Sequence, residues 1–316
     1  MEQRSIGSLE VSLVGLGCNQ FGRKIDAEQS AAVVNAAIDS GVTFFDTSDR
    51  YGYGDRPHSG EGRSEEFLGR AIGSRRASVV IATKFGNQLE GDPKKRGGSR
   101  RWVLEACEGS LRRLGTDYID LYQIHRPDAQ TPIEETLGAL SELKQQGKVR
   151  EIGCSNFTVE QFDDAMSASE QHGHASFQSI QNEYSLLYRE PEKGVLQACE
   201  KHGTAFLPYF PLASGLLTGK YVKDNPTPQD ARLAQFPPNR PHLGLTDENL
   251  DRVARLSQFA ADRGHELLEL AFAWLAARPA VASVIAGATR PDQVVTNTRA
   301  VDWKLSDDDL AVIDEL

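Results

Sequence analysis

One pattern repeats along almost the whole chain of 316 residues: a short apolar run, a helical stretch with a capping residue at its start, and a glycine just past its end. Eight of the apolar runs have the character of buried strands; they are 13–17, 42–45, 79–83, 118–124, 149–154, 176–181, 204–208 and 281–285. Strands that alternate with helices of about 10 to 15 residues predict parallel βαβ units. Eight such units predict an α/β fold, a closed (β/α)8 TIM barrel.

An open Rossmann sheet is the alternative to the barrel. Its dinucleotide-binding form requires a third glycine and a helix directly after the first strand. The first strand here leads into Gly15-Leu16-Gly17-Cys18-Asn19-Gln20, which offers neither. The barrel is therefore favoured.

A β-hairpin is predicted ahead of the barrel, because the segment from residue 4 to residue 12 alternates apolar and polar side chains about Gly7-Ser8. The expected organisation is a single domain, 1–316, with a hairpin at 1–12, the barrel core at 13–290 and C-terminal helices at 291–316.

Capping residues locate several helix starts. Asp26, Ser99, Thr158 and Thr246 each precede a helical stretch and carry a side-chain oxygen that can accept from its first backbone N–H groups. Thr131-Pro132-Ile133-Glu134 has the form of a capping box with proline at the first helical position. We expect a helix to begin there.

The charge balance limits the partners of the chain. Acidic residues number 45 against 35 lysines and arginines, a formal net charge of −10. Nucleic acids and anionic membranes require a cationic surface, so neither is expected as a partner. The N-terminus lacks the apolar segment of a signal peptide, and no apolar run approaches the roughly 18 residues of a membrane span. We expect a cytoplasmic protein.

The cysteines and histidines form no metal-binding pattern. The four cysteines are far apart, as is typical of reduced core residues. They are Cys18, Cys107, Cys154 and Cys199. His172 and His174 have no third ligand nearby, so a solvated helix end is favoured over a metal site. No metal is expected, and the oligomeric state cannot be predicted.

Polar residues follow three successive strands at their carboxyl ends. Asp46 and Tyr51 come after the second strand, Lys84 after the third and His125 after the fourth. Each has an ordinary explanation alone: a turn residue, a loop phenol, a solvated lysine or a hydrogen-bonded rim histidine. In a barrel these strand ends face one cavity, where barrel enzymes carry their functional residues.

The four side chains together suit proton donation. A tyrosine with the ordinary pKa of about 10 donates poorly at neutral pH unless a cation lowers that pKa, and Lys84 supplies a cation. Asp46 as a buried counter-charge keeps Lys84 protonated, and His125 can orient a carbonyl oxygen. The set has no hydride source, so it requires a cofactor.

With these residues in place, the sequence resembles the aldo-keto reductase family from Ile6 to Asn297. The motifs are Asp-Thr-x-x-x-Tyr-Gly at 46–52, Gly-Arg-Ser-Glu-Glu-x-Leu-Gly at 62–69, Thr-Lys at 83–84, Gln-Ile-His-Arg-Pro-Asp at 123–128, Gly-Cys-Ser-Asn-Phe at 153–157 and Pro-Leu-Ala-Ser-Gly-Leu-Leu-Thr-Gly-Lys-Tyr at 211–221. The resemblance implies a barrel with a hairpin at its base, which reversibly reduces aldehydes or ketones with a nicotinamide cofactor. The implied catalytic tetrad is Asp46, Tyr51, Lys84 and His125, with Tyr51 as general acid.

The resemblance also implies cofactor-binding residues. Ser155, Asn156 and Gln181 match the residues that hold the nicotinamide carboxamide. Tyr209 matches the aromatic side chain that stacks on the ring, and core packing is its alternative role. The implied pyrophosphate-binding residues are Leu212, Ser214, Gly215 and Lys220, with Arg232 as a weaker match.

The adenosine-phosphate segment is implied at the start of the last barrel helix. Its residues are Gly287, Thr289, Arg290, Gln293 and Asn297. Arg290 could clamp a ribose phosphate, which favours NADP(H) over the alternative, NAD(H).

Three loops, 52–61, 86–99 and 225–244, are unusual, and long loops of this kind are commonly lids or binding loops. The first contains Tyr53, which competes with Tyr51 for the role of acid.

Three functions remain open. An NADP(H)-dependent reductase of small carbonyl compounds is favoured. An NAD-dependent aldose or alcohol dehydrogenase would run the reaction in reverse. A cofactor-sensing binding subunit, like the potassium-channel barrels that resemble this family, would show little turnover.

Overall fold

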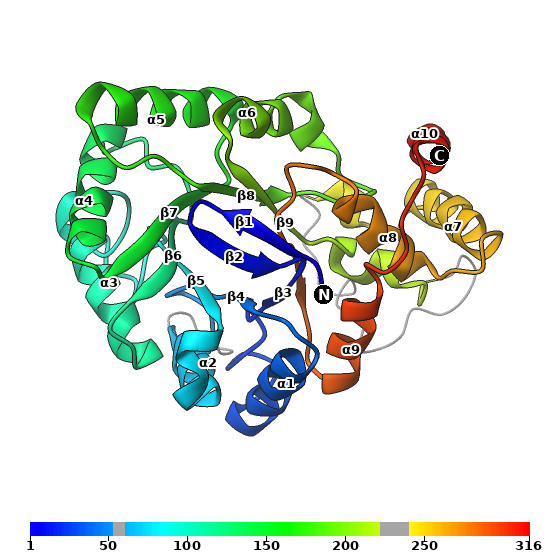
Figure 1. Cartoon of the computed structure of the whole chain (residues 1–316), viewed down its shortest axis with the longest axis horizontal. Helices are drawn as coiled ribbons and strands as arrows, with labels where there is room; N and C mark the ends of the chain where they lie inside the picture. The colour runs from blue at the N-terminus through cyan, green and yellow to red at the C-terminus, as the bar shows by residue number, and fades with distance from the viewer. Residues whose placement is uncertain (53–60, 222–239) are drawn as a thin grey trace.

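A nearly closed barrel of parallel strands forms the centre of the molecule (Figure 1). The computed structural model describes residues 1–52, 61–221 and 240–316. Around the barrel the strand order is β10, β3, β4, β5, β6, β7, β8, β9. Their bounds are β3 Val14–Gly17, β4 Phe44–Asp46, β5 Val80–Phe85, β6 Ile119–Ile124, β7 Val149–Ser155, β8 Ser179–Glu183, β9 Ala205–Tyr209 and β10 Val284–Gly287. The predicted (β/α)8 TIM barrel is confirmed.

The seam between β9 and β10 is joined just ahead of β10. Phe206 N donates to Ala280 O over 2.7 Å, and Ala282 N donates to Phe206 O over 3.0 Å. On its other side β10 pairs with β3 in parallel, Val284 opposite Val14. The first and last strands of the barrel are therefore neighbours.

The predicted hairpin is also confirmed. It consists of β1 Gln3–Ile6 and β2 Leu9–Ser12, paired antiparallel, and it lies across the end of the barrel where the strands begin (Figure 1). Ile6, Leu9 and Val11 are buried in one apolar cluster with barrel residues such as Phe44 and Leu121. This end of the barrel is filled by apolar side chains, so a site can open only at the other end.

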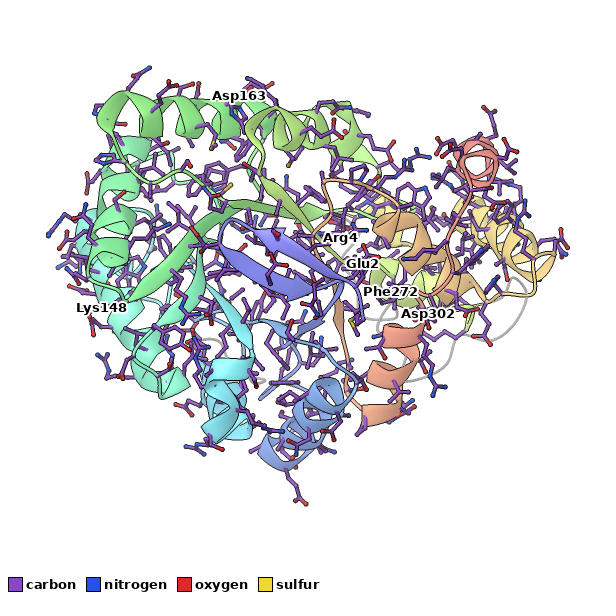
Figure 2. All side chains as sticks on the ribbon, viewed as in Figure 1. Glu2, Arg4, Lys148, Asp163, Phe272 and Asp302 are labelled. Carbon is purple, nitrogen blue, oxygen red and sulfur yellow. The ribbon has the colours of Figure 1, made fainter. Side chains whose placement is uncertain are left out.

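Arg4 fastens the hairpin to the seam. Its guanidinium donates to the carbonyl oxygens of Val281 (2.5 Å), Ala276 (2.7 Å) and Arg278 (3.3 Å). Figure 2 shows Arg4 and Glu2 at the side of the hairpin that faces this part of the chain. The N-terminal segment therefore holds the last βα unit in place.

Helices surround the barrel, and α7 and α10 lie outside α8 (Figure 1). Their bounds are α1 Ala27–Asp39, α2 Arg63–Ile72, α3 Arg100–Leu114, α4 Ile133–Gln145, α5 Val159–His172, α6 Val195–His202, α7 Asp247–Ala261, α8 Leu267–Ala276, α9 Pro291–Arg299 and α10 Asp307–Glu315. Within the described ranges, no helix combines the length and apolar character needed to cross a membrane.

Most predicted helix caps are confirmed. Asp26, Thr158 and Thr246 each accept a hydrogen bond from the backbone at the start of their helix. Ser99 precedes α3, but its side chain makes no capping bond.

The predicted capping box at Thr131 is wrong. Helix α4 begins one residue after Pro132, and the Thr131 hydroxyl donates instead to Asp128 Oδ2 over 2.7 Å. The Asp128 carboxylate is a strong acceptor for that hydroxyl, and it is as near in the sequence as the Glu134 N–H group that Thr131 was expected to cap.

Candidate active site

The side chains that point into the barrel follow the two-residue period of its strands. Phe44 and Ala82 lie in the apolar cluster with the hairpin. Two residues further along the same strands come Asp46 and Lys84, both buried. A charged layer therefore sits directly above an apolar one, at the end of the barrel opposite the hairpin.

Asp46 and Lys84 form an ion pair in this layer. Lys84 Nζ lies 2.7 Å and 2.6 Å from the two carboxylate oxygens and 3.0 Å from Thr47 O. Burial lowers the pKa of Lys84, but attraction and hydrogen bonds to Asp46 and Tyr51 together outweigh burial and leave that pKa above its ordinary value. Lys84 is therefore charged at neutral pH, in agreement with the sequence analysis.

Two amides complete the surroundings of Asp46. Gln181 Nε2 donates to Asp46 Oδ1 over 3.0 Å, and Gln123 Nε2 lies 3.5 Å from the same oxygen. Gln181 is expected from the sequence to face a nicotinamide carboxamide. In this structure its side-chain amide supports the ion pair, and its backbone oxygen accepts from Ser155 Oγ over 2.7 Å.

The Tyr51 ring lies between Lys84 and His125. Its centroid is 5.2 Å from Lys84 Nζ and 5.8 Å from the centroid of the His125 ring, which it meets edge-on. Burial raises the pKa of Tyr51, and the lowering effect of Lys84 does not compensate for it. The expectation that Lys84 brings this pKa below its ordinary value is therefore wrong here. Because Asp46 already balances the charge of Lys84, less of it is left to favour a phenolate.

His125 is neutral. Burial, followed by repulsion from Lys84, Arg126 and Arg50, lowers its pKa well below 6.5. Its Nδ1 atom lies 2.8 Å from Asn87 Nδ2 and 3.2 Å from Ser48 Oγ.

The sequence analysis did not anticipate Asn87 or Ser48. Two signals were available in the sequence. Asn87 follows the strand-end residue Lys84 by three positions, and Ser48 lies between the two tetrad residues Asp46 and Tyr51.

Asn156 joins the ends of three strands. Its Nδ2 donates to His125 O over 2.9 Å and contacts Ser155 Oγ at 3.0 Å, while its Oδ1 accepts from Tyr209 Oη over 2.7 Å. Burial raises the pKa of Tyr209 to about 12. Asn156 has a φ of +62°, a left-handed conformation that asparagine tolerates better than most residues. Tyr209 thus presents a fixed aromatic ring at the barrel mouth.

The loop after β9 turns sharply through three consecutive residues with positive φ. Ala213, Ser214 and Gly215 have φ values of 44°, 57° and 108°. Ser214 Oγ is buried without a hydrogen-bond partner in the described part of the chain. A Cβ atom on Gly215 would lie 3.2 Å from Lys220 Nζ, so lysine and backbone approach closely. The Ser214 hydroxyl and Lys220, rather than the N–H groups of the turn, fit a pyrophosphate group, because Ala213 N and Gly215 N already donate to Phe210 O and Leu212 O. Leu212 O accepts from Gly215 N over 2.7 Å and closes the turn.

The start of α9 carries the implied adenosine-phosphate residues. Gln293 Oε1 accepts from Thr289 N at 2.8 Å and Arg290 N at 3.3 Å. The Arg290 guanidinium forms a forked pair with Asp292, Nε to Oδ1 at 3.0 Å and Nη2 to Oδ2 at 2.8 Å. Asp292 was not expected as a partner, so a phosphate would have to compete with it. The remaining two residues of the set are Gly287, which ends β10, and Asn297, which is buried in α9.

Some predicted residues lie outside the described ranges. They are Tyr53 and Arg232, with most of the loops 52–61 and 225–244. Among the residues that are described, no group of three His, Cys, Asp or Glu side chains could hold a metal ion. The rings of His172 and His174 stack on each other at 5.8 Å.

The chain is similar over nearly its whole length to known proteins of one family. A model of the aldo/keto reductase family matches residues 13–316. A protein named probable voltage-gated potassium channel subunit beta, from Oryza sativa subsp. japonica, is 36% identical over 312 residues, covering 96% of this chain and 92% of its own. Aldo-keto reductase YhdN of Bacillus subtilis is 34% identical over 319 residues, covering 98% and 91%. L-glyceraldehyde 3-phosphate reductase of Escherichia coli is 32% identical over 323 residues, covering 100% and 92%. The chain belongs to the aldo/keto reductase family of oxidoreductases.

Proposed function

We propose that this protein is an NADP(H)-dependent reductase that converts aldehydes or ketones to alcohols, with Tyr51 as general acid. The observation that carries the proposal is the buried Asp46–Lys84 ion pair beside Tyr51, with neutral His125 at the edge of the Tyr51 ring. These groups meet at the end of the barrel where such folds carry their active sites.

The cofactor would be held by residues at three places on the barrel mouth. Ser155, Asn156 and Tyr209 would hold the nicotinamide end, with Gln181 close to them. Leu212, Ser214, Gly215 and Lys220 would hold the pyrophosphate, supported by the Ser214 hydroxyl, which has no hydrogen-bond partner among the described residues. The start of α9 would hold the adenosine phosphate. When bound, the nicotinamide supplies the hydride.

The protein residues manage the proton. Tyr51 keeps its phenolic proton at neutral pH because burial raises its pKa. It gives up this proton when the substrate oxygen becomes strongly basic, and Lys84 then stabilises the phenolate. Asp46 keeps Lys84 charged throughout, and His125 orients the substrate oxygen.

The charges beside His125 favour a substrate with an anionic group. Arg126 and Arg50 both lie close enough to lower the pKa of His125 through their charge. A phosphate or carboxylate near the carbonyl would be attracted to the same arginines. The similarity to L-glyceraldehyde 3-phosphate reductase makes a phosphorylated aldehyde the first substrate to test.

NADP(H) is proposed over NAD(H) because Arg290, at the start of α9, could clamp a ribose phosphate in place of Asp292. Binding titrations with both reduced cofactors test this choice. Tighter binding of NADPH, lost in Arg290→Gln, is the expected result; equal affinities would favour the NAD-dependent dehydrogenase.

Turnover tests the function itself. The near-ultraviolet absorbance of reduced cofactor should fall when an aldehyde is added to the protein, and Tyr51→Phe should abolish that fall. An unchanged rate in Tyr51→Phe would remove Tyr51 from the role of acid. Tight cofactor binding without turnover across a broad carbonyl panel would favour a cofactor-binding subunit, the role that the name of the Oryza relative suggests.

We also propose a cytoplasmic location. The four cysteines are buried and free, which agrees with a reducing compartment.

A further inference from the structure

Asn87 reaches the active site through a tight turn. Strand β5 ends at Phe85, and Gly86 follows with a φ of 101°. The Gly86 carbonyl accepts from Gly97 N over 2.9 Å, which holds the turn. A Cβ on Gly86 would lie 3.4 Å from Ile124 Cγ1, so the chain passes close to the end of β6. This turn places the Asn87 amide beside His125.

The atoms in the contact between Asn87 and His125 show which side chain donates the hydrogen bond. Asn87 Nδ2 lies 2.8 Å from His125 Nδ1, and a side-chain NH₂ group can only donate. Nδ1 must therefore accept. A neutral imidazole has one proton, so that proton must lie on Nε2.

Ser48 does not make this selection. Its hydroxyl lies 3.2 Å from His125 Nδ1 and 3.1 Å from Asp49 Oδ1. If Ser48 donates to Nδ1, the ring proton lies on Nε2. If Ser48 donates to Asp49, its oxygen could accept from a proton on Nδ1. Ser48 is therefore compatible with both tautomers, whereas Asn87, with its Nδ2 facing the ring as in this structure, is compatible with only one.

The charged groups around the ring do not select a tautomer either. Lys84, Arg126 and Arg50 disfavour the doubly protonated ring through their charge. The Asp49 carboxyl reaches the ring only through Ser48, and the uncharged Tyr51 meets it edge-on. These groups keep the ring neutral, and the choice between its two nitrogens is left to Asn87.

We propose that Asn87 is a positioning residue that holds the His125 proton on Nε2, so that His125 donates a hydrogen bond to the substrate oxygen and does not act as a base. The role toward substrate rests on the proposed function. The tautomer itself is a property of the protein without substrate, so it can be measured separately.

Nitrogen-15 NMR of histidine-labelled protein tests the tautomer directly. The His125 signals are assigned by their loss in His125→Gln. At neutral pH we expect a protonated Nε2 and an unprotonated Nδ1 in the wild-type protein. A protonated Nδ1 in the wild-type protein would overturn the proposal.

Asn87→Asp tests whether Asn87 makes the selection. The substitution replaces a donor with an acceptor of nearly the same shape, so we expect a proton on Nδ1. The kcat for carbonyl reduction should fall about 10- to 100-fold, with little change in the KM for cofactor. A proton that stays on Nε2 alone, or an unchanged kcat when the proton has moved from Nε2 to Nδ1, would overturn the proposal.

Two further variants separate this effect from general ones. Gln88→Glu makes the same change of charge one residue further along, and no hydrogen bond joins Gln88 to His125 in the described structure; it should keep the wild-type tautomer. Asn87→Leu removes the donor without adding charge and should give a mixture of tautomers. If the expected tautomer is found but no carbonyl is reduced, the proposed function fails and the assignment of the proton by Asn87 stands.

Discussion

Two buried carboxylates, Asp46 and Asp120, occupy opposite ends of the barrel. Asp120, near the start of β6, is paired with Arg76 at 2.6 Å and Arg150 at 3.0 Å, and also accepts from Ile81 N over 2.9 Å. Both arginines reach solvent. Asp46, at the end of β4, has Lys84 as its cation, and that lysine has no exposure to solvent.

The difference lies in what each ion pair supports. At the hairpin end, the two guanidinium groups flank the Tyr118 ring at 4.0 Å and 4.2 Å, so the charges and the ring stabilise one another. At the other end, the buried ion pair lies beside Tyr51 and His125. We infer that one pair serves stability, and that the other serves the proton transfer of the proposed function.

The largest effect is expected for Lys84→Met. The substitution leaves Asp46 buried without its cation, which costs roughly 3–5 kcal/mol of unfolding free energy, and it removes the charge that stabilises a Tyr51 phenolate. Urea denaturation and turnover assays should both show a loss. Arg150→Met at the hairpin end is the matched control, with a smaller loss of stability and an unchanged kcat. If the two variants lost the same unfolding free energy and the same activity, the two ion pairs would not differ in their roles.

Tyr51→Phe should separate activity from stability. It removes one hydroxyl group and keeps the ring, so the fold should remain while kcat falls about 10²- to 10⁴-fold. Steady-state kinetics measures the fall in kcat, and a thermal unfolding curve measures the stability. A large drop in melting temperature would show that the hydroxyl has a structural role instead.

Asp120→Asn should give the converse result. An amide cannot balance Arg76 and Arg150, so the unfolding free energy should fall by roughly 1–3 kcal/mol. The kcat at a temperature where the variant is folded should equal that of the wild-type protein. A changed kcat would mean that the two ends of the barrel are coupled.

Arg126→Gln tests whether the charge of Arg126 at the barrel mouth attracts an anionic substrate. A loss of one partly solvated charge contact should raise the KM for a phosphorylated aldehyde about 3- to 10-fold, because such contacts contribute on the order of 1 kcal/mol. The KM for an uncharged aldehyde should not change, and added salt should reduce the difference. Equal changes for both substrates would exclude a charge effect.

The smallest effect is the dependence of stability on pH. The folded-state pKa of His125 lies well below its ordinary value of 6.5, so the unfolded chain binds the proton more tightly. The neutral ring contributes its full stability above pH 6.5, and that stability is lost as pH falls through the folded-state pKa. Urea denaturation across this range should show the wild-type protein losing more stability than His125→Gln. If the unfolding free energies of the two proteins changed with pH in parallel, burial of the His125 ring would not be the cause of the pH dependence.

Features set by local rules were predictable from the sequence. Apolar runs predict the strands, and alternation of apolar and polar residues about Gly7-Ser8 predicts the hairpin. The caps at Asp26 and Thr158 are predictable because each side chain accepts a hydrogen bond from the backbone only three residues further along. Asp46, Lys84 and His125 could be found because each lies at a strand end or directly after one, and the barrel geometry then brings those ends together. The long loops could not be interpreted in the same way, because they follow no period.

Features that depend on several neighbours brought together by the fold were not predictable. The direction of the Tyr51 pKa shift depends on how far burial outweighs Lys84, which the sequence does not show. Asn87 and Ser48 meet His125 across 38 and 77 residues of chain. Even the short-range cap at Thr131 failed, because the competing acceptor Asp128 is equally local.

The pairing of β3 with β10 has a consequence for synthesis of the protein. Strand β3 leaves the ribosome first among the barrel strands and β10 leaves last, yet Val14 and Val284 are partners. One edge of β3 therefore stays unpaired until almost the entire chain has been synthesised. The same holds for Arg4, whose carbonyl partners lie near Val281. Unpaired strand edges invite association with other chains. A nascent or truncated chain without β10 should accordingly depend on chaperones, and small deletions at its C-terminal side should reduce yield more than equal changes in the loops.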